Sequence, residues 1–224
     1  MIIGISGHKQ SGKNTVASML QYILSNRGHF CDLTYETWDY WNSSIKEGHL
    51  SNVDPNDLWQ IKSFAQKLKA AVGVLFSVDP KHFEKEEFKD SHIPCQYGNY
   101  TWREILQIVG TDLFRNQFHK DFWVNSTLAD YDTKQKWIIS DVRFQNEADA
   151  IINLGGVILR VERGVYNRDL HESETALNKY PKFFQTIDND STLVELFNKC
   201  LTLCQNLQKL SLIHISEPTR LQLI

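Results

Sequence analysis

The 224-residue sequence predicts an α/β protein with a central parallel sheet flanked by helices. Short apolar segments that read as strands alternate along the chain with longer segments of helical periodicity. The strand segments are continuously apolar, as expected where helices cover both faces of a sheet. The first of them runs directly into a glycine-containing loop and then into a helical pattern. This order places ligands beyond the carboxyl ends of the strands.

The N-terminal strand ends at a loop in which Gly7 is followed by four residues and then by Gly12 and Lys13. Glycines let the backbone approach a phosphate closely, so that its N–H groups point at the oxygens. The following helix adds the positive end of its dipole, and Lys13 can reach the β- and γ-phosphates. We therefore predict that residues 7–15, with Lys9, Gln10 and Ser11 among them, bind a triphosphate. The alternative is a glycine turn that binds nothing.

The residue after the lysine departs from the common pattern. Asn14 stands where Ser or Thr usually contacts Mg²⁺, and the hydroxyl comes one position later, at Thr15. This variant suits small-molecule kinases, which often hold the metal through water, better than GTPases or motors.

The segments that follow the loop have less regular patterns of apolar residues. The loop helix extends to Leu24, and His29–Tyr35 alternates loosely and reads as a second strand. Glu36–Asp57 has no clear period and is long for a connection, so we interpret residues 36–62 as an insertion or flap. A helix then opens at Ser63. Its predicted apolar face comprises Phe64, Leu68, Val72, Leu75 and Phe76.

Residues 63–130 are predicted to form a helical region. The charged run 81–89 is interpreted as a solvated face. Thr101 and Glu104 have the spacing of a capping box at a helix start, and Gly110–Asp112 interrupts the pattern before it resumes at Leu113. Further strands are predicted at 137–141, 157–161 and 186–189, and further helices at 122–129, at 146–154 and from 190 or 191 onward.

Asp141 ends an apolar strand and could hold Mg²⁺ through water near the β- and γ-phosphates. Its alternative role is to cap the following turn. A motor ATPase would usually have a glutamate next, to activate water, whereas this chain has Val142 and then Arg143. A cation at that position can stabilise charge on a transferring phosphoryl group.

Several arginines indicate a second phosphate-binding site. Arg103 and Arg115 are predicted on neighbouring helices, and each could bind an acceptor's monophosphate bidentately, as lysine cannot. Either could equally be a surface residue. Residues 160–175 contain Arg160, Arg163 and Arg168 and are predicted to form a lid that closes over ATP and excludes water.

Composition and charge exclude some classes of ligand and location for this protein. A formal charge of −3 and a pI near 6.2 argue against a nucleic-acid polymer as ligand. No membrane span or signal peptide is expected. The four cysteines lack the spacing of a metal site, which favours a location in the reducing cytoplasm. Cys200 and Cys204 are expected to pack on an apolar helix face. Residues 210–220 can be back-translated into a sequencing-library adapter. We therefore expect one domain at 1–209 and a non-native tail at 210–224.

Together these segments resemble the phage deoxynucleoside monophosphate kinase family. The resemblance covers nearly the whole chain before the tail, in the family's order. The segments that carry it are Gly7–Thr15, Ser63-Phe64-Ala65 with Leu68-Lys69, Arg103–Gln107, Gly110–Asp112, Arg115, Asp121–Val124, Asp141–Ala148, Asp169 and His171–Glu174.

The resemblance implies a P-loop kinase fold with a five-stranded parallel core, an acceptor-binding region and a lid. It also implies transfer of the γ-phosphoryl group of ATP to a deoxynucleoside monophosphate (dNMP) with Mg²⁺, and it allows a homodimer. The implied sites fall into three groups. Lys13, Asp141, Arg143 and Arg163 would act in catalysis, and Thr15 and Asp141 would hold the metal. Phe64, Lys69, Arg103, Arg115, Trp123 and Arg143 would bind the dNMP.

Two points stay open. Trp123 could stack on the acceptor's base or could belong to the core. The whole protein could instead be another small-molecule P-loop kinase, such as a dephospho-coenzyme A kinase, or a module that senses ATP without transferring phosphate. The acceptor-side arginines and the arginine-rich lid favour a kinase over a sensor.

Overall fold

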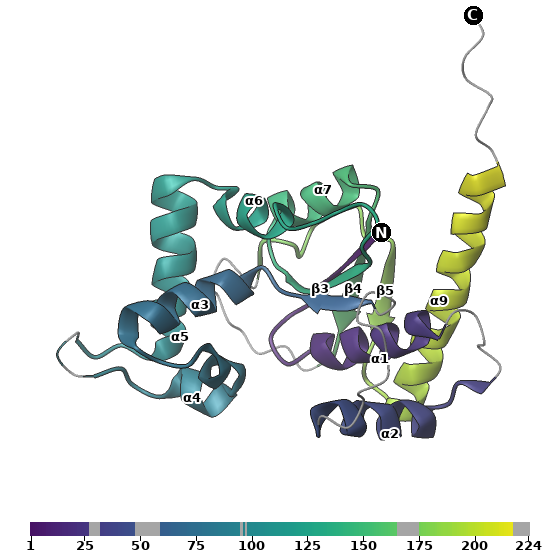
Figure 1. Cartoon of the computed structure of the whole chain (residues 1–224), viewed down its shortest axis with the longest axis horizontal. Helices are drawn as coiled ribbons and strands as arrows, with labels where there is room; N and C mark the ends of the chain where they lie inside the picture. Colours follow the sequence, from purple (N-terminus) through teal and green to yellow (C-terminus); the bar gives the residue numbers. More distant parts are fainter. Residues whose placement is uncertain (27–31, 48–58, 95, 97, 165–174, 217–224) are drawn as a thin grey trace, which may run out of the picture.

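The computed structural model describes residues 1–26, 32–47, 59–94, 96, 98–164 and 175–216. Its centre is a five-stranded sheet in the order β2-β3-β1-β4-β5, and all four strand pairs are parallel. Helices lie on both faces of the sheet (Figure 1), which confirms the predicted class. The strands are β1 (Ile2–Ser6), β2 (Gln60–Lys62), β3 (Trp137–Val142), β4 (Val157–Glu162) and β5 (Gln185–Asp188).

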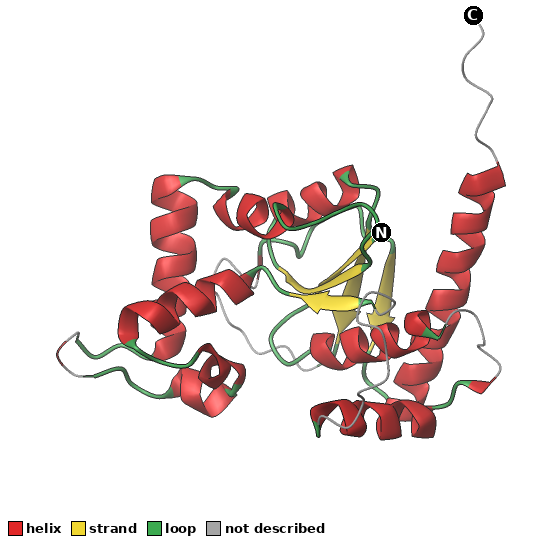
Figure 2. Cartoon of the chain, viewed as in Figure 1, coloured by secondary structure: helices red, strands yellow, loops and turns green. Residues whose placement is uncertain are grey.

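The alternation of side chains in β1 divides the core into two layers. Ile3 and Ile5 are fully buried on the face covered by α1 (Lys13–Ser25) and α9 (Leu193–Ser216), where Cys200 and Cys204 pack as predicted. Helix α2 (Tyr35–Lys46) lies outside these two helices and contacts both. Ile2 is buried on the opposite face, against α6 (Phe122–Leu128) and α7 (Gln145–Asn153) (Figure 2). Both faces are therefore covered, which explains the continuously apolar strands.

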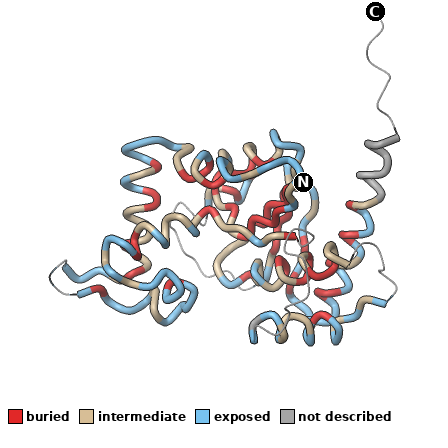
Figure 3. The backbone as a smooth tube through the Cα atoms, viewed as in Figure 1, coloured by how far each residue is buried: buried red, intermediate tan, exposed pale blue. Residues whose placement is uncertain are grey.

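A helical arm projects from one side of the sheet. It comprises α3 (Ala65–Phe76), η2 (Pro80–Glu84), α4 (Glu86–Asp90), α5 (Trp102–Gln107) and η4 (Ile108–Phe118). The arm has its own small apolar cluster around Val72, Phe83 and Trp102. Exposed residues predominate in the arm and buried residues in the sheet (Figure 3).

The predicted second strand is wrong over its described part. Residues 29–31 lie outside the described residues, and Thr34 is the N-cap of α2: its hydroxyl accepts from Thr37 N–H, and Thr37 returns the bond. A reciprocal cap of this kind begins a helix. Tyr35 of the predicted strand and residues 36–46 of the predicted irregular stretch are thus helical, and residues 48–58 lie outside the described residues. The second strand is instead β2, a short edge strand whose polar residues give no alternation.

Two details of the arm also differ from prediction. Glycine at position 110 does not interrupt the helix, because α5 continues directly into η4, a π-helix in which each turn is one residue wider than in an α-helix. The capping box of Thr101 and Glu104 is present as predicted. Leu75 does not belong to the buried face of α3, since it is 69% exposed.

No helix among the described residues has the length and apolar content needed to span a membrane. Helix α9 continues to Ser216, while its buried contacts are described as far as Leu207.

Candidate active site

The loop between β1 and α1 has the backbone conformation of a phosphate cradle. Gly12, the N-cap of α1, has φ of 95°, a left-handed conformation that favours glycine. At Gly7 a β-carbon would lie 2.4 Å from the carbonyl oxygen of Val161, so the close approach of β4 requires glycine there. Gln10 is left-handed at φ of 64°, a strained conformation that proteins tend to keep at functional loops.

Lys13 points back into this loop. Its Nζ donates to the carbonyl oxygens of Gly7 (2.8 Å) and His8 (2.6 Å). Burial, and then the nearby Arg143, lowers the pKa of Lys13 to about 7. An anion in the loop would favour the charged form of this lysine. The ammonium group therefore lies where a phosphate would meet it.

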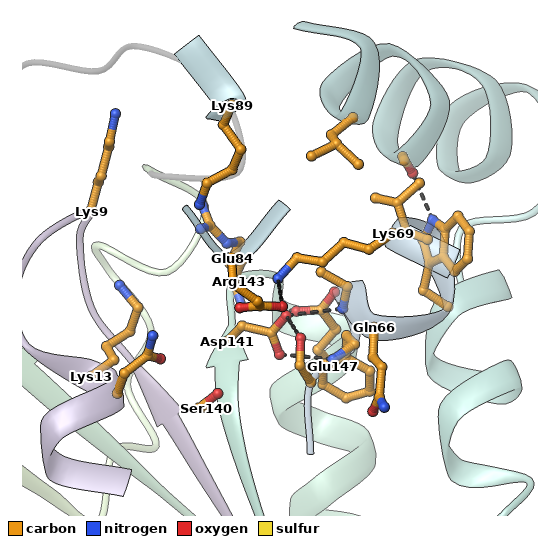
Figure 4. Close-up of a pocket in the computed structure, with 18 of the residues that line it drawn as sticks. Lys9, Lys13, Gln66, Lys69, Glu84, Lys89, Ser140, Asp141, Arg143 and Glu147 are labelled. Atoms are coloured by element: carbon orange, nitrogen blue, oxygen red, sulfur yellow. Dashed lines mark hydrogen bonds and ion pairs between the residues drawn. The ribbon is translucent and has the colours of Figure 1, made fainter. Parts of the chain in front are cut away.

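The loop forms one wall of a pocket of about 730 Å³, and the arm forms the opposite wall. In Figure 4 Lys9 and Lys13 lie on one side, Lys69 on the other, and Asp141 and Arg143 between them. The wall residues among those predicted are Lys9, Gln10, Gly12, Lys13, Asn14, Thr15, Phe64, Lys69, Arg103, Arg115, Trp123, Asp141 and Arg143. Gly7 and Ser11 shape the loop from behind this surface.

Asp141 is held firmly at the end of β3. Its Oδ2 accepts from Ser63 Oγ (2.6 Å) and from Ala65 N–H (2.9 Å), and its Oδ1 accepts from Phe64 N–H (2.8 Å). The carboxylate thus caps the start of α3, an element distant in sequence, and not the turn that follows it. This cap ties the arm to the centre of the sheet.

The pocket offers oxygen donors that fit Mg²⁺. The Thr15 hydroxyl and the Asp141 carboxylate both lie on its wall, and Oδ1 accepts one hydrogen bond from the described residues, which leaves it able to accept from water. The described residues contain no group of three acid, histidine or cysteine side chains for a tighter metal. Magnesium usually takes one or two carboxylates and completes its shell with phosphate and water. This donor set is compatible with that preference.

Arg103 is paired with acids on the arm. Its guanidinium contacts Glu86 (2.8 Å) and Asp90 (2.7 Å). Glu86 also pairs with Lys89 and lies 3.8 Å from Lys9 of the loop. The run 81–89 is therefore more than the solvated face that its charges suggested, because Glu84, Glu86 and Lys89 line the pocket.

Arg115 is far more buried than Arg103. It forms an ion pair of 2.6 Å with Glu147 of α7, in which the two side chains are 9% and 3% exposed. Its guanidinium lies 3.7 Å from the ring centroid of Phe144. Burial raises the pKa of Glu147, and Arg115 opposes that shift. The alternative that Arg115 is a surface residue is wrong, because its side chain belongs to a buried network on the pocket wall.

The aromatic and lysine positions on the acceptor side have structural partners too. Trp123 is 5% exposed, donates from Nε1 to Gly110 O (2.8 Å) and packs on Phe122, so its base-stacking role stays a prediction. Phe64 is also buried on the pocket wall. Lys69 pairs with Glu84 at 2.8 Å.

The predicted lid is described only at its two ends. Arg160 does not belong to it: this side chain is buried within β4 and donates to Ser6 Oγ (3.3 Å). Arg163 is exposed just after β4 and does not line the pocket. Residues 165–174, including Arg168 and His171, lie outside the described residues.

Sequence reasoning missed two residues that support the site. Glu147 lies in the segment Asp141–Ala148, but the sequence assigns it no role in the site, because its partner Arg115 is 32 positions away. Asn189, after β5, is buried and donates from Nδ2 to Ser11 O (2.9 Å) in the phosphate loop. A β-carbon at Gly12 would lie 2.3 Å from that same nitrogen, so Asn189 gives a second reason for glycine there.

A parallel sheet with a phosphate loop after β1, a lysine at the helix start and an arginine-bearing wall opposite defines the class of P-loop kinases. The sequence model of the deoxynucleotide monophosphate kinase family matches residues 49–200, more than half of the chain. The chain belongs to that family, and it is a nucleotide kinase.

Three relatives are consistent with this assignment. A putative deoxynucleotide monophosphate kinase of Acanthamoeba polyphaga mimivirus is 30% identical over 226 residues, which cover 94% of this chain and 100% of the relative. The deoxynucleotide monophosphate kinase of Enterobacteria phage T4 is 34% identical over 103 residues, 43% of this chain and 42% of its own. That of Escherichia phage RB69 is 28% identical over 109 residues, 45% and 44% of the two chains.

Proposed function

We propose that the protein transfers the γ-phosphoryl group of ATP to a dNMP, giving ADP and a deoxynucleoside diphosphate. The observation that carries this proposal is a single pocket with two cationic walls, Lys13 on one and Arg103 and Arg115 on the other. Two anionic substrates can face each other in such a pocket. A protein that only senses ATP has no need of the second wall.

The chemistry requires positioning and charge. An oxygen of the acceptor phosphate attacks the γ-phosphorus, and the bond from that phosphorus to the oxygen bridging to the β-phosphate breaks. Lys13 would hold the β- and γ-phosphates while the loop amides of residues 7–15 orient them. Arg143, beside Asp141 on the wall, would stabilise charge on the transferring group. Arg163 would reach the phosphates when the predicted lid closes.

Thr15 and Asp141 would hold Mg²⁺, the second through water, and the metal would neutralise charge on the phosphates. Phe64, Lys69 and Trp123 would complete the acceptor site around Arg103 and Arg115. These assignments agree with the position of each residue on the pocket wall.

The test is a coupled assay for ADP with a panel of acceptors. ATP, Mg²⁺ and the protein are combined with dTMP, dGMP, dCMP, dAMP, their ribose counterparts or dephospho-coenzyme A, and a reaction without acceptor measures background hydrolysis. We expect ADP formation to depend on one or more of the deoxynucleotides. ADP release that no monophosphate increases would refute the proposal, and a response to dephospho-coenzyme A alone would favour the other kinase.

A further inference from the structure

Glu147 occupies an unusual position for a carboxylate, buried at the first turn of α7 on the pocket wall. Its two oxygens are directed at different elements. Oε1 accepts from Nη2 of Arg115 (2.6 Å), and Oε2 accepts from the backbone N–H groups of Arg143 (2.8 Å) and Phe144 (3.1 Å). One carboxylate therefore contacts the side chain of one wall arginine and the main chain of another.

Arg115 is fixed from several directions by this network. Besides Glu147, its Nη1 donates to Asn146 Oδ1 (3.2 Å) and Lys120 O (3.3 Å), and Phe144 lies against the guanidinium plane. These bonds use three of the five guanidinium donors. The Nε donor is buried and has no partner among the described residues.

A helix-capping role would explain only half of these contacts. A glutamate at the third position of a helix commonly accepts from the backbone at the helix start, and Glu147 does so through Oε2. That cap needs no arginine. The second oxygen holds a cation that would be costly to bury alone, and it restricts the direction in which the guanidinium faces.

We propose that Glu147 is a positioning residue, which aligns Arg115 for the phosphate of the acceptor. The proposal rests on the proposed function, since it assigns Arg115 to the monophosphate. It implies that loss of the Glu147 carboxylate weakens binding of the acceptor and not of ATP, because Glu147 acts through Arg115.

The matched variants are Glu147→Gln and Asp149→Asn, two carboxylate-to-amide changes on the same helix. Asp149 accepts from Tyr180 Oη (2.9 Å) and Lys182 Nζ (3.0 Å) and does not line the pocket. For Glu147→Gln we expect KM for the dNMP to rise at least tenfold and KM for ATP to change less than about threefold, the scale of a lost charged hydrogen bond. Asp149→Asn should change neither constant.

A structural role predicts a different result. If Glu147→Gln lowers the thermal midpoint but leaves both KM values unchanged, or raises them equally, the proposal is wrong. Should Glu147→Gln not fold, Asn146→Ala removes a second, partly exposed bond to Arg115 and should raise KM for the dNMP in the same direction. An unchanged KM for Asn146→Ala would then overturn the proposal.

A double-mutant comparison identifies the residue through which Glu147 acts. Arg115→Gln alone and Arg115→Gln with Glu147→Gln should have KM values for the dNMP within about threefold of each other. Effects that multiply would show that Glu147 acts elsewhere. Failure of the proposed function would look different, because the wild-type protein would then form no ADP in response to any dNMP.

Discussion

The two walls of the pocket hold their cations by different means. On the loop wall, Lys13 binds two backbone carbonyl oxygens within six positions of itself. On the arm wall, Arg103 and Arg115 bind carboxylates from other elements, 13 to 32 positions away. The loop wall is thus built from local backbone geometry, while the arm wall depends on tertiary contacts between side chains.

This difference has a consequence for substrate exchange. A phosphate entering the loop replaces neutral carbonyl oxygens around Lys13, whereas a phosphate at the arm must compete with Glu86 or share Arg115 with Glu147. Carboxylate partners keep the arginines oriented and keep their charge balanced while the site is empty. Mutations should therefore separate the two walls.

The largest expected effect is on the loop wall. Lys13→Ala should lower turnover at least a hundredfold, because removal of an electrostatic contact with the transferring group typically costs several kcal/mol. The measurement is kcat in the coupled ADP assay. Lys134→Ala, an exposed lysine before β3, is the control and should behave as wild type. A loss of less than tenfold in Lys13→Ala would contradict the assignment.

The two arm arginines should differ in stability. Arg115→Ala leaves Glu147 buried without its partner and should lower the free energy of unfolding by about 3–5 kcal/mol. Arg103→Ala breaks pairs whose acids are at least half exposed, so it should cost less than about 1 kcal/mol. Urea unfolding measures both. Equal losses would mean that the contrast between buried and exposed pairs is wrong.

Both arginine variants should also weaken acceptor binding. We expect KM for the dNMP to rise about tenfold or more in each, with KM for ATP nearly constant. A defect confined to KM for ATP would contradict the assignment of these residues to the acceptor.

Asn189, distant in the sequence, supports the loop wall with its side chain, and the loss of this support should have a moderate effect. Asn189→Ala removes the donor to Ser11 O and should raise KM for ATP by about three- to tenfold, the scale of one neutral hydrogen bond. Lys199→Ala is a close control, since that side chain donates to the neighbouring Asp188 O and not to the loop. A rise in KM for the dNMP instead would place Asn189 with the other wall.

The lowered pKa of Lys13 predicts that binding of ATP is linked to the uptake of a proton. Its pKa of about 7 in the free protein is well below the usual lysine value, and a bound triphosphate should raise it again. Near pH 8.5, where free Lys13 is mostly neutral, binding of a non-hydrolysable ATP analogue should take up close to one proton. Near pH 6 Lys13 should contribute almost none. Calorimetry in buffers of different ionisation enthalpy measures the uptake, and no uptake at the higher pH would refute it.

The smallest effect is expected at the end of the chain. Deletion of residues 210–224 should leave kcat unchanged and the thermal midpoint within a few degrees, because the described buried contacts of α9 extend to Leu207. A large loss of activity would show that the tail is part of the native protein.

The sequence predicted the elements whose signals are local. Glycine spacing, helix caps and continuous apolar runs are visible within a few residues. The sequence therefore predicted the phosphate loop, the capping box at Thr101 and the strands β1, β3, β4 and β5. Strand β2 was missed since it is a polar edge strand of three residues. Helix α2 was missed because most of its residues are polar, although Thr34 supplied a cap.

The partners of the site residues could not be predicted. Asp141 was expected at the pocket, but its bonds to Ser63 and to the backbone of α3 depend on how the arm is packed on β3. The same holds for Arg115 and Glu147. A single sequence shows where charges lie along the chain and not which of them meet, so the roles assigned from it to individual arginines stay predictions.

The π-helical character of η4 sets how Arg103 and Arg115 face each other. Both belong to one uninterrupted helical segment, α5 followed by η4. In an α-helix each residue turns by about 100°, and the wider turns of η4 change the azimuth that Arg115 reaches at its end. Removing one residue between Ile108 and Gly110 would therefore turn Arg115 away from Glu147 while leaving Arg103 in place. The width of the π-helical turns therefore determines the direction in which the Arg115 side chain points.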